Sequence, residues 1–323
     1  MKEDIFLEKI TVESKRLPLL KPYVLSFDTI HFLDSITTEI SFSNGMVKKA
    51  ETVPLPGYSD ETKESIEAYL EKVCKTLLHT KKNVARTIVA KDISLHPFAC
   101  SPILTAIDLT EFNFQDPDTR SVDFVIPLSS TNIKELKNSI EQISKIPSTI
   151  KVKLTGKNEI DIYCIREMQN MKTEDLHIRF DANQAFSYND AKLFYKELSS
   201  MPFLKQVDYI EQPLANNAWD GHAELVKQFP NINTMLDESI ITNEDILKAA
   251  SIGVPFIKFK LFKQGGIKEL LEQISLAFEH QLKIVLGNGV ASELSNKIEN
   301  AIYLDQKHKL FGASEANGFL KLA

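Results

Sequence analysis

The sequence predicts an α/β fold: a (β/α)8 TIM-type barrel that carries an N-terminal α+β capping domain. From about residue 120 onward, eight short apolar runs alternate with helical stretches, and eight parallel strands close such a barrel. Before that point the pattern is β structure followed by amphipathic helix. We therefore expect a capping domain at residues 1–115, with the C-terminal tail packing near it, and a barrel domain at residues 116–323.

The eight apolar runs favour a barrel over an open sheet. They are SVDFVIPL, TIKVKL, LHIRFDA, QVDYIEQ, NTMLDES, FIKFKLF, LKIVLGN and HKLFGAS. An open doubly wound sheet is the alternative, and it requires a glycine-rich phosphate loop after an early strand. The sequence has no such loop at that position. The barrel is therefore the expected architecture.

The N-terminal residues have a different pattern from the alternating units of the barrel. Partial alternation of apolar and polar residues leads into Asn44-Gly45, a strong signal for a hairpin turn. Residues 59–78 then predict an amphipathic helix in which Ser59 or Asp60 serves as the N-cap. This change of pattern is the reason to expect a separate capping domain.

Composition and charge exclude several classes of protein. A net charge of −6 over 323 residues, without a concentrated basic patch, argues against a nucleic-acid partner. No apolar run approaches the ~18 residues of a membrane span. Three cysteines without CxxC spacing are typical of reduced thiols, and the N-terminus lacks the apolar core of a signal peptide. We expect a cytoplasmic protein with a small-molecule carboxylate as partner, and the sequence leaves a homo-oligomer open.

Three acidic residues stand at the ends of consecutive strand-like runs. Asp181, Glu211 and Asp237 end the third, fourth and fifth runs. The carboxyl ends of parallel strands meet at one end of a barrel, so these carboxylates should converge there. Converging carboxylates repel one another, and a hard divalent cation such as Mg²⁺ offsets that repulsion. Adjacent residues of a strand point to opposite faces, so either Asp237 or its neighbour Glu238 could be the acid that faces this site.

Two lysines stand at the ends of the second and sixth runs, on opposite sides of the expected barrel. Lys153 ends the second run and Lys260 the sixth, and Lys151 shares a face with Lys153. An inward-pointing lysine is costly unless it is paired or functional. With Lys151 and a metal lowering its pKa, Lys153 could act as a base on a proton α to a carboxylate. The metal would stabilise the resulting enediolate.

These residues lie in motifs that resemble a known family. KVKLTG, RFDANQAF, IEQP, LDES and KLFKQGG resemble, in order, the barrel motifs of the muconate-lactonizing-enzyme subgroup of the enolase superfamily. The resemblance implies that Asp181, Glu211 and Asp237 bind Mg²⁺, with Mn²⁺ as a substitute ion. It also implies that Lys153 and Lys260 are the catalytic lysines, and it favours Asp237 over Glu238 as the ligand.

The branch within the subgroup depends on a weaker motif. ETVPLPGYSDET, residues 51–62, resembles the capping domain of o-succinylbenzoate synthases. That resemblance implies a lyase that dehydrates its substrate in menaquinone synthesis. One alternative is an isomerase with two lysine bases, either a dipeptide epimerase of the L-Ala-D/L-Glu type or an N-succinylamino acid racemase. Another is a barrel that binds without catalysing.

The same resemblance suggests which residues contact the substrate. The expected contacts are Lys151, Asn183, Asn288, Ser292 and Glu315 from the barrel, with Tyr23 and Phe27 from a capping loop. In dipeptide epimerases of this subgroup an Asp-x-Asp pair holds the substrate's ammonium group. Here the matching stretch is Glu315-Ala316-Asn317, so one of the two charges is retained.

Overall fold

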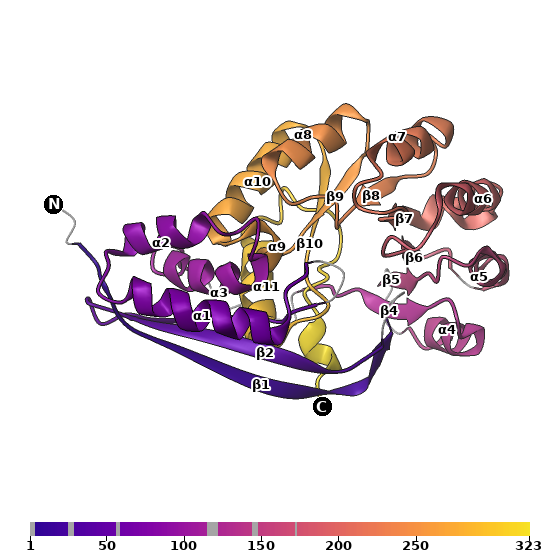
Figure 1. Ribbon diagram of the computed structural model, residues 1–323. Helices are drawn as coiled ribbons and strands as arrows, with labels where there is room; N and C mark the ends of the chain where they lie inside the picture. Colours follow the sequence, from indigo (N-terminus) through magenta and orange to yellow (C-terminus); the bar gives the residue numbers. More distant parts are fainter. Residues whose placement is uncertain (1–3, 25–28, 56–58, 115–121, 144–147, 172) are drawn as a thin grey trace.

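A three-stranded antiparallel sheet with three helices lies beside a curled parallel sheet that is surrounded by helices (Figure 1). The computed structural model describes the chain except residues 1–3, 25–28, 56–58, 115–121, 144–147 and 172. The predicted fold class is confirmed. The predicted boundary between residues 115 and 116 lies outside the described residues, and the division into two domains stays a prediction.

The antiparallel sheet is formed by β1 (Leu7–Val24), β2 (Thr29–Phe42) and β3 (Val47–Thr52), paired in that order. The predicted hairpin turn joins β2 to β3, and Gly45 has a φ of +81°, which glycine adopts without the steric cost of a side chain. The Asn44 side chain accepts a hydrogen bond from the Met46 amide at 3.2 Å, which fixes this turn.

Three helices cover this sheet: α1 (Lys63–Leu77), α2 (Lys82–Ala90) and α3 (Pro97–Asp108). The prediction of Ser59 or Asp60 as N-cap of α1 is wrong. Thr62 is the cap, because its hydroxyl accepts from the Ser65 amide and Ser65 bonds back to the Thr62 backbone. Glu61, the residue before Thr62, caps α3 instead, because its carboxylate accepts from the two backbone amides of Phe98 and Ala99 at the start of α3.

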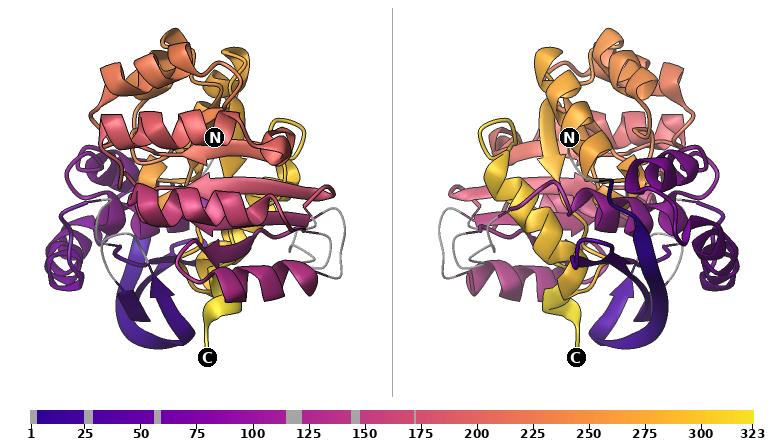
Figure 2. Two further views of the ribbon diagram at one scale, coloured as in Figure 1. Left: turned by 90° about the vertical axis from the view of Figure 1, so that its right-hand side faces the viewer. Right: turned by 90° about the vertical axis from the view of Figure 1, so that its left-hand side faces the viewer.

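Seven strands pair in chain order to form the parallel sheet. They are β4 (Ile126–Ser129), β5 (Ser148–Lys153), β6 (Leu176–Asp181), β7 (Val207–Glu211), β8 (Thr234–Leu236), β9 (Phe256–Phe259) and β10 (Lys283–Leu286). The helices that alternate with them are α4 (Ile133–Glu141), α5 (Asn158–Met168), α6 (Tyr188–Ser199), α7 (Trp219–Gln228), α8 (Asn243–Ser251), α10 (Ile267–Glu279) and α11 (Glu293–Asp305). The short elements are η2 (Pro202–Gln206), α9 (Leu261–Gln264) and η3 (Gly318–Lys321). In Figure 2 the helices lie on the outside of the curled sheet.

The eighth predicted strand closes the ring through single bridges rather than a continuous ladder. Leu310 bridges Ile284 of β10, and Ser314 bridges Phe124 just before β4, both in the parallel sense. Gly312 lies between these bridges with a φ of +64°, which interrupts the extended backbone. A Cβ at Gly312 would lie 2.5 Å from Nη2 of Arg179, so the close approach of that guanidinium requires glycine there.

The chain terminus joins the two parts of the molecule. Leu322 bridges Leu19 of β1, and the Ala323 amide donates to the Pro18 carbonyl at 3.0 Å. Elsewhere Phe98 of α3 stacks on Phe262 of α9, with 4.3 Å between ring centroids. Among the described helices, none has the length and apolar character that crossing a membrane requires.

Candidate active site

The predicted acids and lysines lie together at the carboxyl ends of neighbouring strands. Lys153, Asp181 and Glu211 are the last residues of β5, β6 and β7, and they pair in register. Asp237 follows β8 directly, and Lys260 follows β9. All of them except Asp237 are among the residues that line a small cavity of about 40 Å³. We call these five residues the rim.

Lysine ammonium groups hold both aspartates of the rim. Asp181 Oδ2 accepts from Lys153 at 2.5 Å and lies 2.9 Å from Lys151 Nζ. Asp237 accepts from Lys260 at 2.5 Å through Oδ2 and from Lys263 at 2.8 Å through Oδ1. Burial raises the pKa of each carboxyl, but the surrounding ammonium groups lower it more, so both pKa values lie below the ordinary range. Both aspartates are therefore ionised at neutral pH.

Two lysines bind the two oxygens of Glu211 from deeper in the barrel. Lys151 Nζ lies 2.7 Å from Oε2, and Lys258 Nζ lies 3.2 Å from Oε1. Burial and the nearby charge of Asp181 raise the pKa of the Glu211 carboxyl. Lys258 lies two residues before Lys260, so the sequence predicts that the two side chains share a face, as Lys151 and Lys153 do, but it assigns Lys258 no role in the site.

A second charged cluster lies below the rim, and we call it the floor. It consists of Lys151, Arg179, Tyr209, Lys258 and Glu315. The Glu315 carboxylate accepts from Arg179 at 3.0 Å, Tyr209 at 2.9 Å, Lys151 at 2.8 Å, and Lys258 through a short contact. Burial raises the pKa of Glu315, but the three cations lower it well below the ordinary value. Glu315 is thus the counter-ion of buried cations.

Glu238 is a buried carboxyl next to the rim with one unsatisfied oxygen. Its Oε1 accepts from Asn183 Nδ2 at 3.2 Å, while its Oε2 is buried without a hydrogen-bond partner among the described residues. Burial and then the charge of Asp237 raise the Glu238 pKa to about 7. Asn183 also accepts from Lys153 Nζ at 2.7 Å, so it links Glu238 to that lysine.

The chemistry of these side chains fits a hard divalent cation. In the part of the chain that the structure describes, no three acidic or histidine side chains are arranged around one metal-binding point, because lysines hold the carboxylate oxygens. The donors available are nevertheless carboxylate oxygens on consecutive strands, which is the set that Mg²⁺ prefers. The unsatisfied, buried Oε2 of Glu238 is a further oxygen beside them that a cation would satisfy. The residues therefore fit the predicted ion.

Several predicted substrate contacts have other partners in the structure. Asn288 lines the cavity and accepts from the Val290 amide at 3.0 Å; its contact with a substrate stays a prediction. Ser292 is not among the lining residues; it caps α11 and donates to Glu51 of β3 at 2.5 Å, because it lies where the two parts of the molecule meet. Glu315 lines the cavity, but its carboxylate accepts from the floor side chains Lys151, Arg179, Tyr209 and Lys258, and its contact with a substrate stays a prediction.

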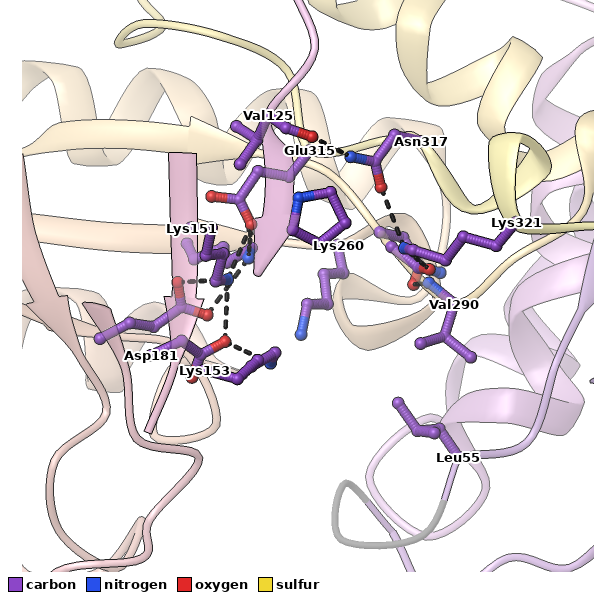
Figure 3. Close-up of a pocket in the computed structure, with 15 residues that line it drawn as sticks. Leu55, Val125, Lys151, Lys153, Asp181, Lys260, Val290, Glu315, Asn317 and Lys321 are labelled. Atoms are coloured by element: carbon purple, nitrogen blue, oxygen red, sulfur yellow. Dashed lines mark hydrogen bonds and ion pairs between the residues drawn. The ribbon is translucent and has the colours of Figure 1, made fainter. Parts of the chain in front are cut away.

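The capping residues predicted to touch the substrate are only partly described. Tyr23 lies in β1, where it pairs with Ile30. Phe27 lies outside the described residues, so both contacts stay predictions. Figure 3 instead shows Leu55 from the N-terminal part, facing Lys151 and Asp181 across the cavity. Lys321 of η3 also lines the cavity, and neither Lys321 nor Leu55 follows a periodic pattern that would have predicted it.

The family model described as enolase C-terminal domain-like matches residues 135–308, so the chain belongs to this family of the enolase superfamily and is an enzyme. A hydrophobic dipeptide epimerase of Enterococcus faecalis is 25% identical over 281 residues, which cover 82% of this chain and 77% of the relative. An L-Lys-D/L-Arg epimerase of Desulforapulum autotrophicum is 23% identical over 301 residues, covering 87% and 82%.

Solved structures share this fold over nearly the whole chain. An N-succinyl Arg/Lys racemase from Bacillus cereus has a TM-score of 0.87 at 20% identity, covering 99% of this chain and 89% of that one. A dipeptide epimerase from Enterococcus faecalis, complexed with Mg and L-Leu-L-Tyr, has a TM-score of 0.83 at 20% identity, covering 98% and 92%. A muconate lactonizing enzyme from Pseudomonas fluorescens has the same TM-score and identity, covering 99% and 90%.

Proposed function

We propose that this enzyme is a Mg²⁺-dependent epimerase that inverts the carbon α to a carboxylate in a dipeptide. The observation that carries the proposal is the placement of Lys153 and Lys260. They come from the second and sixth positions of the eight-membered ring, which are opposite each other, and both line the same cavity. Inversion requires one group to remove the proton from one face and another to return a proton to the other face.

Each rim residue has a part in this reaction. Asp181, Glu211 and Asp237 would hold the metal, which supplies positive charge to the enediolate that forms when the proton leaves. Lys153 and Lys260 exchange the proton with the two faces of the α-carbon. The hydrogen bond from Lys153 to Asn183 and that from Lys260 to Asp237 fix where the two ammonium groups lie.

An epimerase is better supported than the o-succinylbenzoate synthase that the sequence favoured. The relatives and structures described above are named epimerases, a racemase and a muconate lactonizing enzyme, and none of them is named a synthase. Within the motif that suggested the synthase, residues 56–58 lie outside the described part of the chain. Glu51 of that motif bonds to Ser292 and Ser295 at the start of α11 and does not line the cavity.

An N-acylamino acid is the second candidate substrate, and the state of Glu315 favours it. The carboxylate of Glu315 already accepts from four donors in the floor. Asn317, which stands where a second acid would help to hold an ammonium group, is an uncharged amide. Lys321 lines the same cavity. An acylated nitrogen carries no charge, so it does not require the acids that a dipeptide's ammonium group requires.

Proton exchange in heavy water tests the proposal. The enzyme with Mg²⁺ is incubated in D2O with a panel of L,L-dipeptides and N-succinylamino acids, and deuterium at the α-carbon is measured in both epimers by NMR. We expect deuterium in recovered substrate and product of one class. A succinylated hydroxycyclohexadiene carboxylate is tested alongside the panel, and loss of water from it without deuterium in the recovered substrate would identify a synthase instead. An absence of both reactions over the panel, with substrate still bound, would support a binding barrel.

Single-lysine variants test the two-base arrangement directly. In Lys260→Ala, the α-proton of one epimer should still exchange with deuterium from the solvent, while the α-proton of the other epimer should not. Lys153→Ala should show the opposite selectivity. If both variants lose exchange from the same epimer, the two lysines do not act on opposite faces.

A further inference from the structure

We propose that Lys258 is a positioning residue that weakens metal binding at the active site, because it aims a fixed positive charge at Glu211. The inference rests on the magnesium site of the proposed function, but it concerns the binding of the ion and does not depend on which substrate is used.

Lys258 lies one layer below the rim. It belongs to β9 and comes two residues before Lys260, so both side chains point into the barrel. Its ammonium group is 3.2 Å from Glu211 Oε1 and also donates to Glu315 Oε2. The side chain is 3% exposed, so the solvent does little to screen this charge. Lys258 thus acts on a candidate ligand from the side opposite the cavity mouth.

The two oxygens of Glu211 are both engaged from below. Lys151 binds Oε2 at 2.7 Å while Lys258 binds Oε1. Lys151 also contacts Asp181 and Glu315, so it neutralises several carboxylates at once. Lys258 adds a second buried cation at the same glutamate. A carboxylate that already binds two ammonium groups has less negative potential to offer a divalent ion.

The floor keeps Lys258 charged and in place. The Lys258 ammonium group donates to the carboxylates of both Glu211 and Glu315, and these two negative charges favour its charged form. Glu315 is itself held by Arg179 and Tyr209, so it cannot follow Lys258 toward solvent. A mobile surface lysine could swing away when a metal arrives. Lys258 cannot, so its repulsion of the ion persists in the loaded site.

The charges that line the cavity indicate how removal of the Lys258 charge would change metal binding. Five lysines and three acids line it: Lys151, Lys153, Lys258, Lys260 and Lys321, with Asp181, Glu211 and Glu315. A divalent ion adds to an excess of positive charge. Removing the charge of Lys258 should therefore strengthen metal binding, whereas removing an ordinary structural lysine would leave it unchanged or weaken it.

Calorimetric titration of the metal-free protein with MgCl2 tests this inference. Lys258→Met removes the charge and retains an apolar chain of similar length. Lys258→Gln removes the charge but retains an N–H donor for Glu211 or Glu315, so a folded variant remains available if the methionine variant is unstable. Lys283→Met, on the neighbouring strand β10 with an exposed side chain, is the matched control. Circular dichroism and a cooperative thermal transition establish that each variant is folded.

We expect both Lys258 variants to bind Mg²⁺ about 10- to 100-fold more tightly than the wild type, the range over which residues behind metal ligands alter affinity. Lys283→Met should match the wild type. Unchanged or weaker binding in a folded Lys258 variant overturns the inference. If wild-type protein binds no Mg²⁺ at all, the magnesium site of the proposed function fails; if it binds Mg²⁺ and epimerises substrate while the variants bind no more tightly, only this inference fails.

Discussion

The rim and the floor of the barrel both pair buried carboxylates with lysines, but the pairs differ in what they leave available for chemistry. At the rim, lysines pair with Asp181 and Asp237, and the Lys153 side chain retains 15% exposure toward the cavity. In the floor, Glu315 accepts from four donors, and the side chains of Arg179 and Lys258 are 0% and 3% exposed. At the rim, Asp181 and Asp237 can exchange an ammonium partner for a metal, while both oxygens of Glu315 in the floor are already engaged by donors.

This difference shows how position decides the role of a buried ion pair. A lysine at a strand end faces the space where a substrate binds, so its charge and its proton are available for chemistry. A lysine one layer deeper is enclosed by other side chains, and removing its partner leaves an uncompensated buried charge. Substitutions at the rim should therefore alter turnover, and substitutions in the floor should alter stability.

The largest effect is expected for Lys153→Ala, which removes a rim base. Its kcat should fall by about 10² to 10⁴-fold, the usual contribution of a positioned acid or base, while the melting temperature changes little and Mg²⁺ binding is not weakened, because the variant also removes a positive charge from Asp181. Turnover is measured on the substrate identified by deuterium exchange, with exposed Lys157→Ala as the control. Near-normal turnover in the Lys153 variant would mean that Lys153 is not a base in the reaction and that rim and floor lysines do not differ in this role.

Glu315→Ala removes the centre of the floor. It leaves Lys151, Arg179 and Lys258 without their shared counter-ion, so the free energy of unfolding should fall by about 3–5 kcal/mol. Urea unfolding at pH 7 measures this change, and Glu272→Ala on the exposed face of α10 should lie within about 0.5 kcal/mol of the wild type. A loss of stability no larger than that of the control would show that the floor cations are compensated by other groups.

A smaller, pH-dependent effect is expected from His222, a buried side chain without the partners that the floor provides. It is 0% exposed in α7, its ring nitrogens have no hydrogen-bond partner among the described residues, and burial lowers its pKa from 6.5 to about 4. The unfolded chain takes up a proton below pH 6.5 and the folded chain does not, so stability falls as the pH drops from 6.5 to 4. The loss should reach about 3 kcal/mol.

The difference in unfolding free energy between wild type and His222→Leu, measured by urea titration from pH 7 to pH 4, isolates this contribution. The wild type should lose stability relative to the variant over that range. The pKa of Glu315 is lowered in the folded protein, so the floor also loses stability as the pH approaches 4, but this contribution is common to both proteins and cancels in the difference. A pH-independent difference would mean that His222 is protonated or hydrated in the folded protein.

The sequence predicted much of the rim because strand ends are visible in it. Apolar runs that end in Asp181 or Glu211 place a carboxylate at a known end of a parallel strand, and the spacing of the runs places neighbours side by side. The sequence named Lys151 and Glu315 of the floor only as substrate contacts. It did not predict that they form one cluster with Arg179 and Lys258, because these residues lie far apart in the chain. The cap of α1 was also mistaken, because a hydroxyl near a helix start can bond to several competing partners; the substrate contact of Ser292 stays a prediction.

By itself, the sequence determined the barrel, the strand ends that carry the rim and the family to which the chain is similar. Those features depend on periodicity and short motifs, which are local. Only the tertiary structure decided that Glu315 faces three cations, that Lys258 reaches Glu211 and that Ser292 joins the two parts of the molecule. These contacts join residues 47 to 241 positions apart, and their electrostatic energy depends on burial and distance, neither of which is encoded at a single position.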